Sequence, residues 1–224
     1  MLHKVSFIKR WLSYLYPVRI QHADGMNNTI LELYLYRGQW QLGTANALYS
    51  DGWRYRPIAE AFRTLTSHLS SVRKMLVLGV GLGSAAMMMG RRRLYPEMTL
   101  VDHDKTSLEW AIQLQDERTA KHLKPVCEDE AIYMREDAEK FDLMIVDIFE
   151  DRVVPAFVTE TTFLQLCHDR IADGGHFVMN YIENKQGDWE TVQKNIRNVF
   201  PLHDVIQFGI NKVVVARQQH TMET

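Results

Sequence analysis

A glycine-rich turn that follows a short apolar segment constrains the fold of this chain more than any other feature. Residues 75–78 are uniformly apolar, which predicts a strand buried on both faces. Gly79, Gly81 and Gly83 follow at once, and a run of helix-forming residues opens at Ser84. Alternate glycines let the backbone turn sharply and approach a ligand closely, where a Cβ atom would collide.

A carboxylate follows at the position where a nucleotide-binding turn needs one. A second apolar strand is predicted at 98–101 and ends on Asp102, about twenty residues beyond the glycines. A carboxylate there can accept hydrogen bonds from both hydroxyls of a ribose. The pattern therefore predicts a site for a nucleotide-type cofactor. The alternative is a tight turn of an ordinary α/β protein with a solvated acid nearby.

From Lys74 onward strands and helices alternate, which predicts a mainly parallel sheet with helices on both faces. Strands are expected at 75–78, 98–101, 125–127, 141–148, 176–181, 205–208 and 212–216, and helices at 57–69, 106–118, 131–136, 159–171 and 189–199, with one more beginning at Ser84. Only a short turn joins the last two strands, so they must be antiparallel. Residues 29–36 alternate with period two and 39–43 form a partner strand. We predict an N-terminal segment with a small β unit over 1–54 and a Rossmann-like domain over 55–224.

The terminal hairpin bears on the kind of cofactor. Nicotinamide-binding and S-adenosylmethionine-binding folds both begin with a glycine turn and an acid, but a final antiparallel hairpin favours the second. Asp129 follows the third strand of this domain, where a carboxylate can accept a hydrogen bond from the exocyclic amine of adenine. A nicotinamide-dependent dehydrogenase is left as a remote alternative.

These pieces belong to a wider pattern. From about Leu31 to Ala216 the chain resembles spermidine synthase and its relatives, through ALYSDGWRY, LGVGLGS, LVDHD, EDEA, IVDIFED and IADGGHFVMNY. The resemblance implies a small N-terminal β domain on a seven-stranded class I methyltransferase-type domain. It also implies transfer of an aminopropyl group from decarboxylated S-adenosylmethionine to a small-molecule amine, without a metal, by a protein that forms a homodimer.

The resemblance also implies roles for individual residues. Asp147 matches the catalytic Asp at the end of the fourth strand and would act as the base, while Glu150 matches a second, substrate-binding acid. The implied cofactor contacts come from Tyr55, Gly79, Gly81, Gly83, Asp102, Asp129 and Asp147.

Three departures from the family count against aminopropyl transfer. Leu82 stands where the glycine loop of the family carries an Asp, and Arg56 replaces a His beside Tyr55. No Pro-Thr-Tyr segment, which lines the amine pocket of the family, occurs between residues 200 and 212. Only Asp147, Glu150 and Asp151 could surround a polyamine. An S-adenosylmethionine-dependent methyltransferase and a non-catalytic binding protein that kept the fold are therefore the alternatives.

Charge and cysteine content narrow the remaining possibilities. A formal net charge of -2 gives no general attraction to nucleic acid. Cys127 and Cys167 are far apart in sequence, and no His or Cys group has metal-site spacing, so we expect neither a disulfide framework nor a metal.

The N-terminal segment is the last feature to interpret. No apolar run approaches the ~20 residues that cross a bilayer. Basic residues interrupt the apolar ones, which argues against a signal peptide. A basic amphipathic segment on a membrane surface is one reading. We instead expect Phe7, Ile8, Trp11 and Leu12 to pack onto the body, and we expect a cytoplasmic protein with no membrane partner.

Overall fold

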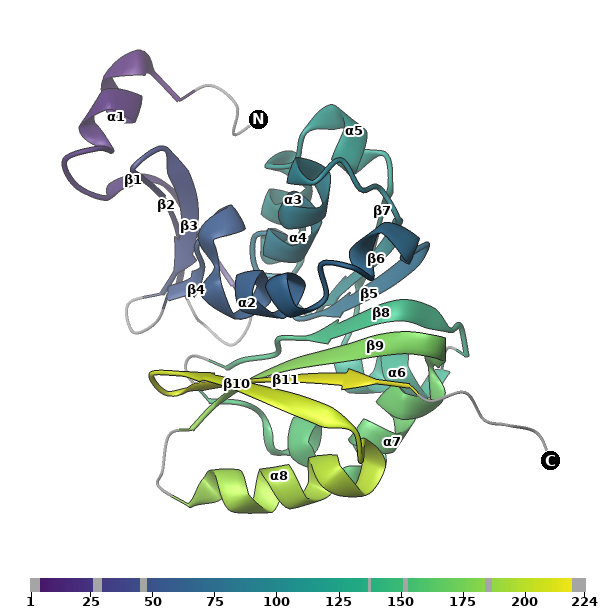
Figure 1. Cartoon of the computed structure of the whole chain (residues 1–224). Coiled ribbons are helices and arrows are strands. Elements are labelled where there is room, and N and C mark those ends of the chain that lie inside the picture. The colour runs from purple at the N-terminus through teal and green to yellow at the C-terminus, as the bar shows by residue number, and fades with distance from the viewer. Residues whose placement is uncertain are drawn as a thin grey trace.

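Two sheets organise the chain (Figure 1). A computed structural model describes residues 5–25, 30–44, 48–136, 138–150, 153–183 and 187–218. The N-terminal sheet is antiparallel, with the order β1-β2-β3-β4. Its strands are β1 (Val18–Asp24), β2 (Ile30–Tyr36), β3 (Gln39–Gly43) and β4 (Leu48–Ser50).

The larger sheet has seven strands in the order β10-β11-β9-β8-β5-β6-β7. These strands are β5 (Lys74–Leu78), β6 (Glu97–Asp102), β7 (Leu123–Cys127), β8 (Phe141–Val146), β9 (Ile171–Ile182), β10 (His203–Phe208) and β11 (Asn211–Arg217). Pairing is parallel from β9 to β7, whereas β11 is antiparallel to both β9 and β10. The predicted α/β class, with its terminal hairpin and a small β unit in front, is confirmed.

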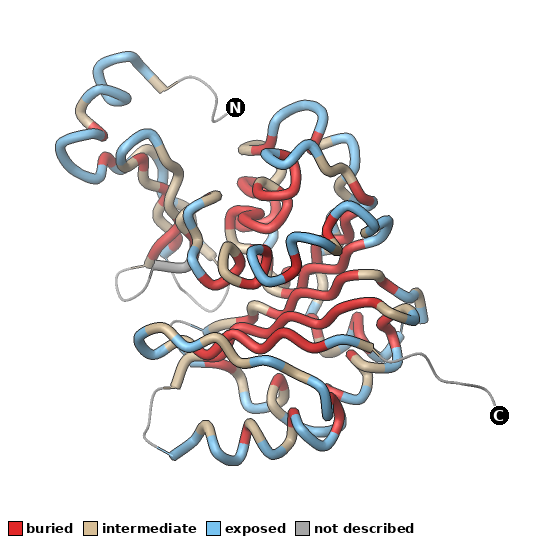
Figure 2. The backbone as a smooth tube through the Cα atoms, viewed as in Figure 1, coloured by how far each residue is buried: buried red, intermediate tan, exposed pale blue. Residues whose placement is uncertain are grey.

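Helices cover both faces of the larger sheet, and Figure 2 shows the strands buried between them. One layer contains α2 (Arg56–Thr64), α3 (Ser84–Arg91) and α4 (Lys105–Gln113). The opposite layer contains α6 (Glu130–Glu136), α7 (Thr161–Asp169) and α8 (Asp188–Val199). In the described parts of the chain, each helix falls short of the length and apolarity that a bilayer crossing requires.

The two sheets share a small apolar cluster. Leu31, Leu33 and Leu42 project from the N-terminal sheet and pack with Leu82 and Trp110, which belong to the glycine loop and α4. All five side chains are buried. Burial of these side chains stabilises the N-terminal sheet against the larger domain.

Some element boundaries differ from the sequence-based expectation. The single helix predicted over 106–118 is two helices, because the Asp116 side chain accepts hydrogen bonds from the backbone N–H groups of Arg118 and Thr119 and begins α5 (Glu117–Ala120). Strand β9 begins at Ile171, so the expected turn at 173–175 lies within it. Strand β1 was not predicted, because its sequence lacks a clear alternation.

The expectation for the N-terminal segment is wrong for Phe7, Ile8 and Trp11, whereas Leu12 is partly buried. Helix α1 (Phe7–Leu12) buries no residue, and the exposed fractions of Phe7, Ile8 and Trp11 are 81%, 70% and 60%. The contact with the body is made instead by Ser13, whose backbone oxygen accepts a hydrogen bond from the Arg37 N–H at 2.7 Å. An amphipathic pattern indicates that a helix has an apolar face but not what covers that face.

Candidate functional site

A cavity of about 330 Å³ lies at the carboxyl ends of β5, β6 and β8. In the sheet, β5 lies between β6 and β8. The chain adds β6 and β7 on one side of β5 and then crosses to β8 on the other, so the strand order reverses at β5. Ligands of open α/β sheets bind in the crevice outside such a reversal. Leu31, Leu42 and Ser50 of the N-terminal sheet line the opposite wall. The volume suits a nucleoside-sized ligand.

The glycine loop joins β5 to α3 and has a left-handed backbone at Gly79, Gly81 and Gly83 (φ 78°, 53° and 70°). Gly79 and Gly81 line the cavity. A Cβ atom at Gly79 would lie 2.4 Å from the backbone oxygen of Asp147, so this glycine lets two strand ends meet. Gly83 ends the loop on the side away from the cavity, where a Cβ atom would meet the Gln115 side chain. Its part in cofactor binding would therefore be indirect.

Asp102 ends β6 and faces the cavity. Its carboxylate accepts hydrogen bonds from the backbone N–H groups of Val80 and Asp104, both at 2.9 Å. These bonds fix the carboxylate relative to the glycine loop, and each oxygen keeps a free lone pair for a hydroxyl donor. Burial outweighs them and raises the pKa of Asp102 to about 6.

The acid after β7 that lines the cavity is not the one that sequence favoured. Asp129 is exposed and caps α6, accepting hydrogen bonds from the backbone N–H groups of Ala131 and Ile132 at 2.9 and 3.0 Å. Its neighbour Glu130 is only 3% exposed and lines the cavity. The two are adjacent in sequence, and the start of α6 decides which one turns inward. Sequence reasoning missed Glu130 because both are acids after the same strand.

His103 faces the cavity beside Glu130, with 3.6 Å between Nδ1 and a carboxylate oxygen. This partner raises the pKa of His103 to about 9, so the imidazole is cationic at neutral pH. Potential ligand atoms of Asp102, His103 and Glu130 lie within 4.8 Å of one another. The group could hold a cation, but it also forms the wall on which the nucleoside would sit.

A hydrogen-bonded cluster surrounds Asp147 just after β8. One carboxylate oxygen accepts from Tyr55 Oη at 3.1 Å and from Asn180 Nδ2 at 2.9 Å. Asn180 Nδ2 also lies 3.1 Å from Tyr55 Oη, and Asn211 Nδ2 donates to Asn180 Oδ1 at 3.0 Å. Burial raises the pKa of Asp147 to about 6, although both donors oppose the shift. The structure therefore brings Tyr55 and Asp147 together.

Asn180 and Asn211 were not identified from sequence. Asn180 is 1% exposed and interrupts an otherwise apolar part of β9. A single amide in a buried strand needs hydrogen-bond partners, so its position in the sequence was a usable signal.

Glu150 is exposed and lines the cavity at its mouth. Its backbone exchanges two hydrogen bonds of 2.9 Å with Val153, which closes a tight loop. Asp151 lies outside the described residues.

Leu82 and Arg56, the two residues that differ from the family pattern, do not line the cavity. Leu82 is fully buried in the cluster between the sheets. Arg56 begins α2, where its guanidinium lies 4.7 Å from the centre of the Phe208 ring and 3.6 Å from Glu60. An Asp in place of Leu82 would lie among apolar side chains in this arrangement.

Comparison with known proteins agrees with the geometry. A family model described as the spermine/spermidine synthase domain matches residues 63–214. A probable polyamine aminopropyl transferase of Bifidobacterium longum is 27% identical over 130 residues, which are 56% of this chain and 28% of the relative. The match thus spans little more than a quarter of that relative.

Solved structures show the same fold. A probable spermidine synthase from Corynebacterium glutamicum superposes with a TM-score of 0.74 at 17% identity, covering 90% of this chain and 81% of that one. Spermidine synthase from Thermotoga maritima gives 0.68 at 16% identity, with coverage of 89% and 72%. Human methyltransferase-like protein 13, in complex with SAH, gives 0.59 at 21% identity, with coverage of 77% and 83%.

Proposed function

The chain belongs to the spermine/spermidine synthase family, and from that premise we propose that it transfers an aminopropyl group from decarboxylated S-adenosylmethionine to a small-molecule amine. One observation carries the proposal. The Asp147 cluster and the nucleoside wall formed by Gly79, Gly81 and Asp102 face one cavity. A base is thereby held next to the place where a sulfonium nucleotide would sit.

The nucleotide half of the cavity fits such a ligand. Gly81 leaves room for close approach of the backbone, and Asp102 offers lone pairs to ribose hydroxyls. Glu130 is the carboxylate that would receive the adenine amine, in place of Asp129. No metal is needed for this chemistry, and the absence of a resident metal remains a prediction.

The sulfonium supplies an electrophilic methylene carbon. The acceptor nitrogen attacks that carbon, the carbon–sulfur bond breaks, and the thioether leaves with the bonding pair. The proton released by the nitrogen passes to Asp147, whose second oxygen accepts no hydrogen bond from Tyr55 or Asn180. A carboxylate with a pKa of about 6 is ionised at pH 7 and can take this proton, so turnover should fall below pH 6.

The amine would enter past Glu150. This carboxylate at the mouth can hold a distal ammonium group while Asp147 holds the nitrogen that reacts. Two carboxylates in line suit a diamine or a longer polyamine better than a neutral acceptor.

Calorimetric titration tests the donor. The protein is titrated in parallel with decarboxylated S-adenosylmethionine, S-adenosylmethionine, methylthioadenosine and NAD. We expect the decarboxylated form and methylthioadenosine to bind most tightly. Release of methylthioadenosine in the presence of a panel of diamines and polyamines then identifies the acceptor, with Asp147→Asn as the inactive control that still binds donor.

Methyl transfer is the second candidate, and Leu82 favours it. The described glycine loop has no carboxylate facing the cavity for the donor amino group. Tighter binding of S-adenosylmethionine than of its decarboxylated form would support methyl transfer instead. No binding of any of the four ligands would support the non-catalytic alternative. A homodimer and a cytoplasmic location remain predictions.

A further inference from the structure

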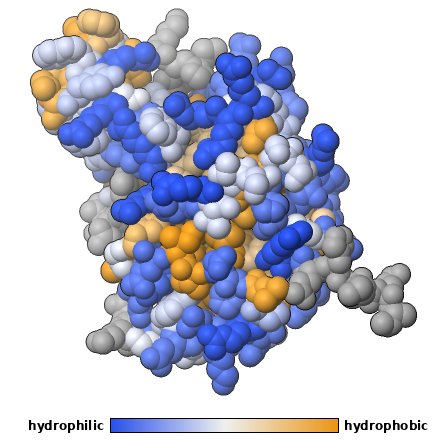
Figure 3. All heavy atoms as spheres, in the orientation of Figure 1, coloured by the Kyte–Doolittle hydropathy of each residue, from blue (hydrophilic) through white to orange (hydrophobic). Residues whose placement is uncertain are grey.

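Five large apolar side chains near the N-terminus are exposed on one small part of the surface. We call them the apolar stripe: Phe7, Ile8, Trp11, Tyr14 and Leu15, exposed by 81%, 70%, 60%, 61% and 65%. Figure 3 shows apolar residues over α1, apart from the rest of the molecule. Contiguous exposed apolar surface marks an interaction site more often than scattered single residues do.

Phe7, Ile8 and Trp11 of the apolar stripe face away from the protein, whereas the Tyr14 hydroxyl lies against Gly38 of the β2–β3 turn. At ~100° per residue, Phe7, Ile8 and Trp11 lie within about 100° of one another around the helix axis. Backbone hydrogen bonds from Tyr14 to Trp11 and from Leu15 to Leu12 continue the turn. Ser13 faces the opposite way and is fully buried, so this side of the segment contacts the β2–β3 turn. Figure 1 shows α1 at the periphery of the molecule, near β1 and β2.

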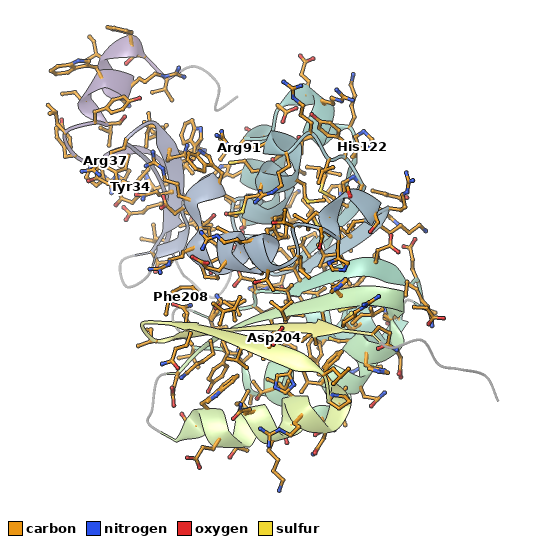
Figure 4. The ribbon with its side chains drawn as sticks, in the orientation of Figure 1. Tyr34, Arg37, Arg91, His122, Asp204 and Phe208 are labelled. Atoms are coloured by element: carbon orange, nitrogen blue, oxygen red, sulfur yellow. The ribbon has the colours of Figure 1, made fainter. Side chains whose placement is uncertain are left out.

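Basic side chains flank the apolar stripe. Lys9 and Arg10 are exposed on the same helix. Arg37 is not one of these flanking cations, because its backbone N–H donates to Ser13 on the side that faces the β2–β3 turn, and Figure 4 shows it at the end of β2. The first 23 residues contain four Lys or Arg and no Asp or Glu, in a chain whose formal net charge is -2. Glu32, the nearest described acid on β2, is paired with Arg19 at 2.6 Å.

We propose that the apolar stripe and its flanking cations dock this protein onto an anionic lipid surface. An aromatic ring with a polar edge, such as that of Trp11, suits the boundary between headgroups and acyl chains. Lys and Arg side chains beside them reach anionic headgroups while their stems cover apolar surface. A short amphipathic segment of this kind gives reversible binding in the plane of the membrane.

A second copy of the chain fits the same surface less well. A two-fold interface brings the same patch of both subunits together. Lys9 and Arg10 of one copy would then approach those of the other with no acid in the patch to neutralise them. On an anionic lipid surface, the charges of Lys9 and Arg10 are instead attracted by headgroups of opposite charge.

Vesicle co-sedimentation of the full chain tests the proposal. Vesicles of phosphatidylcholine with 30% phosphatidylglycerol are compared with vesicles of phosphatidylcholine alone, at low and at high salt. We expect binding to the anionic vesicles only, weaker at high salt because exposed charges are screened. Each basic residue near such a surface contributes about fivefold, so the double variant Lys9→Gln, Arg10→Gln should bind about 25-fold more weakly.

Matched variants separate the apolar stripe from general effects. Trp11→Ser should lower binding to anionic vesicles by at least about tenfold while leaving the melting temperature unchanged, since Trp11 supports no core. Leu202→Ser removes another exposed apolar side chain, 58% exposed, and Lys121→Gln another exposed cation. Neither control should alter binding.

Light scattering after size-exclusion chromatography tests whether a second copy of the chain, instead of a lipid surface, covers the apolar stripe. A dimer that becomes a monomer in Trp11→Ser, without vesicle binding by the parent protein, would overturn the lipid proposal in favour of a second copy. Equal binding to neutral and anionic vesicles, or unchanged binding of Trp11→Ser, would also overturn it.

Discussion

Gly79→Ala tests the contact on which the site depends. Gly79 has φ 78°, and an added Cβ atom would lie 2.4 Å from the backbone oxygen of Asp147, 2.7 Å from its carbonyl carbon and 2.9 Å from the backbone nitrogen of Ile148. All three are backbone atoms, so no side chain can rotate to relieve the overlap. The end of β8, which carries the proposed base, would have to move.

The expected cost has two parts. A left-handed backbone costs an alanine roughly 1–2 kcal/mol relative to glycine. Overpacking adds about 1–3 kcal/mol. Gly79→Ala should therefore destabilise the protein by roughly 2–5 kcal/mol.

Gly209→Ala is the matched control, because Gly209 has φ 55° and nothing within 4 Å of an added Cβ. Gly209→Ala should lower the free energy of unfolding only by the cost of the left-handed backbone, roughly 1–2 kcal/mol. Urea unfolding at 25 °C measures both values. Equal losses in the two variants would refute the close approach of the glycine loop to Asp147.

Three further predictions concern single side chains in and around the cavity. The raised pKa of Asp147 means that the folded protein loses stability as pH rises from about 4 to about 6. The melting temperature of Asp147→Asn should therefore exceed that of the parent above pH 6 and match it below pH 4. A difference in melting temperature that stays the same at every pH would contradict the burial of this charge. Glu130→Gln should weaken methylthioadenosine binding by about tenfold, whereas Asp129→Ala should leave calorimetric affinity unchanged and lose about 1 kcal/mol of stability as a lost helix cap; the reverse result would restore Asp129 to the site. Leu82→Asp should cost at least about 3 kcal/mol in urea unfolding, because it places a charge in the cluster between the sheets, and stability close to that of the parent would show that the residue faces the cavity instead.

The part of the site that local sequence encodes was predictable. Gly79, Gly81 and Asp102 follow directly from the strand, the turn and the next strand, and the structure brings all three to one cavity. Their arrangement depends only on how parallel strands end at one edge of a sheet.

Other residues depended on information that spacing does not carry. The choice between Asp129 and Glu130 turns on where α6 begins, and helix boundaries are uncertain by more than the one residue that separates them. When only the sequence of the glycine loop is considered, Leu82 indicates that a carboxylate of the family is missing. Its burial against Leu31 and Trp110 requires the N-terminal sheet to be in place.

The N-terminal segment illustrates a different limit. The spacing of Phe7, Ile8 and Trp11 indicates an apolar face whether that face covers the body or points outward. The contacts of Ser13 with Arg37 and Gly38 set the direction, and none of these residues stands out in the sequence.

The position of β11 has a consequence for protein synthesis. Strand β11 lies between β9 and β10 although it follows both in the chain, so β9 keeps an open edge until residues 211–217 have left the ribosome. An unpaired edge can associate with other chains. Asn211 on the same strand holds Asn180, which in turn contacts Asp147. A nascent chain that stalls before β11 would therefore have an incomplete cluster around Asp147 and an unpaired β9 edge that can aggregate.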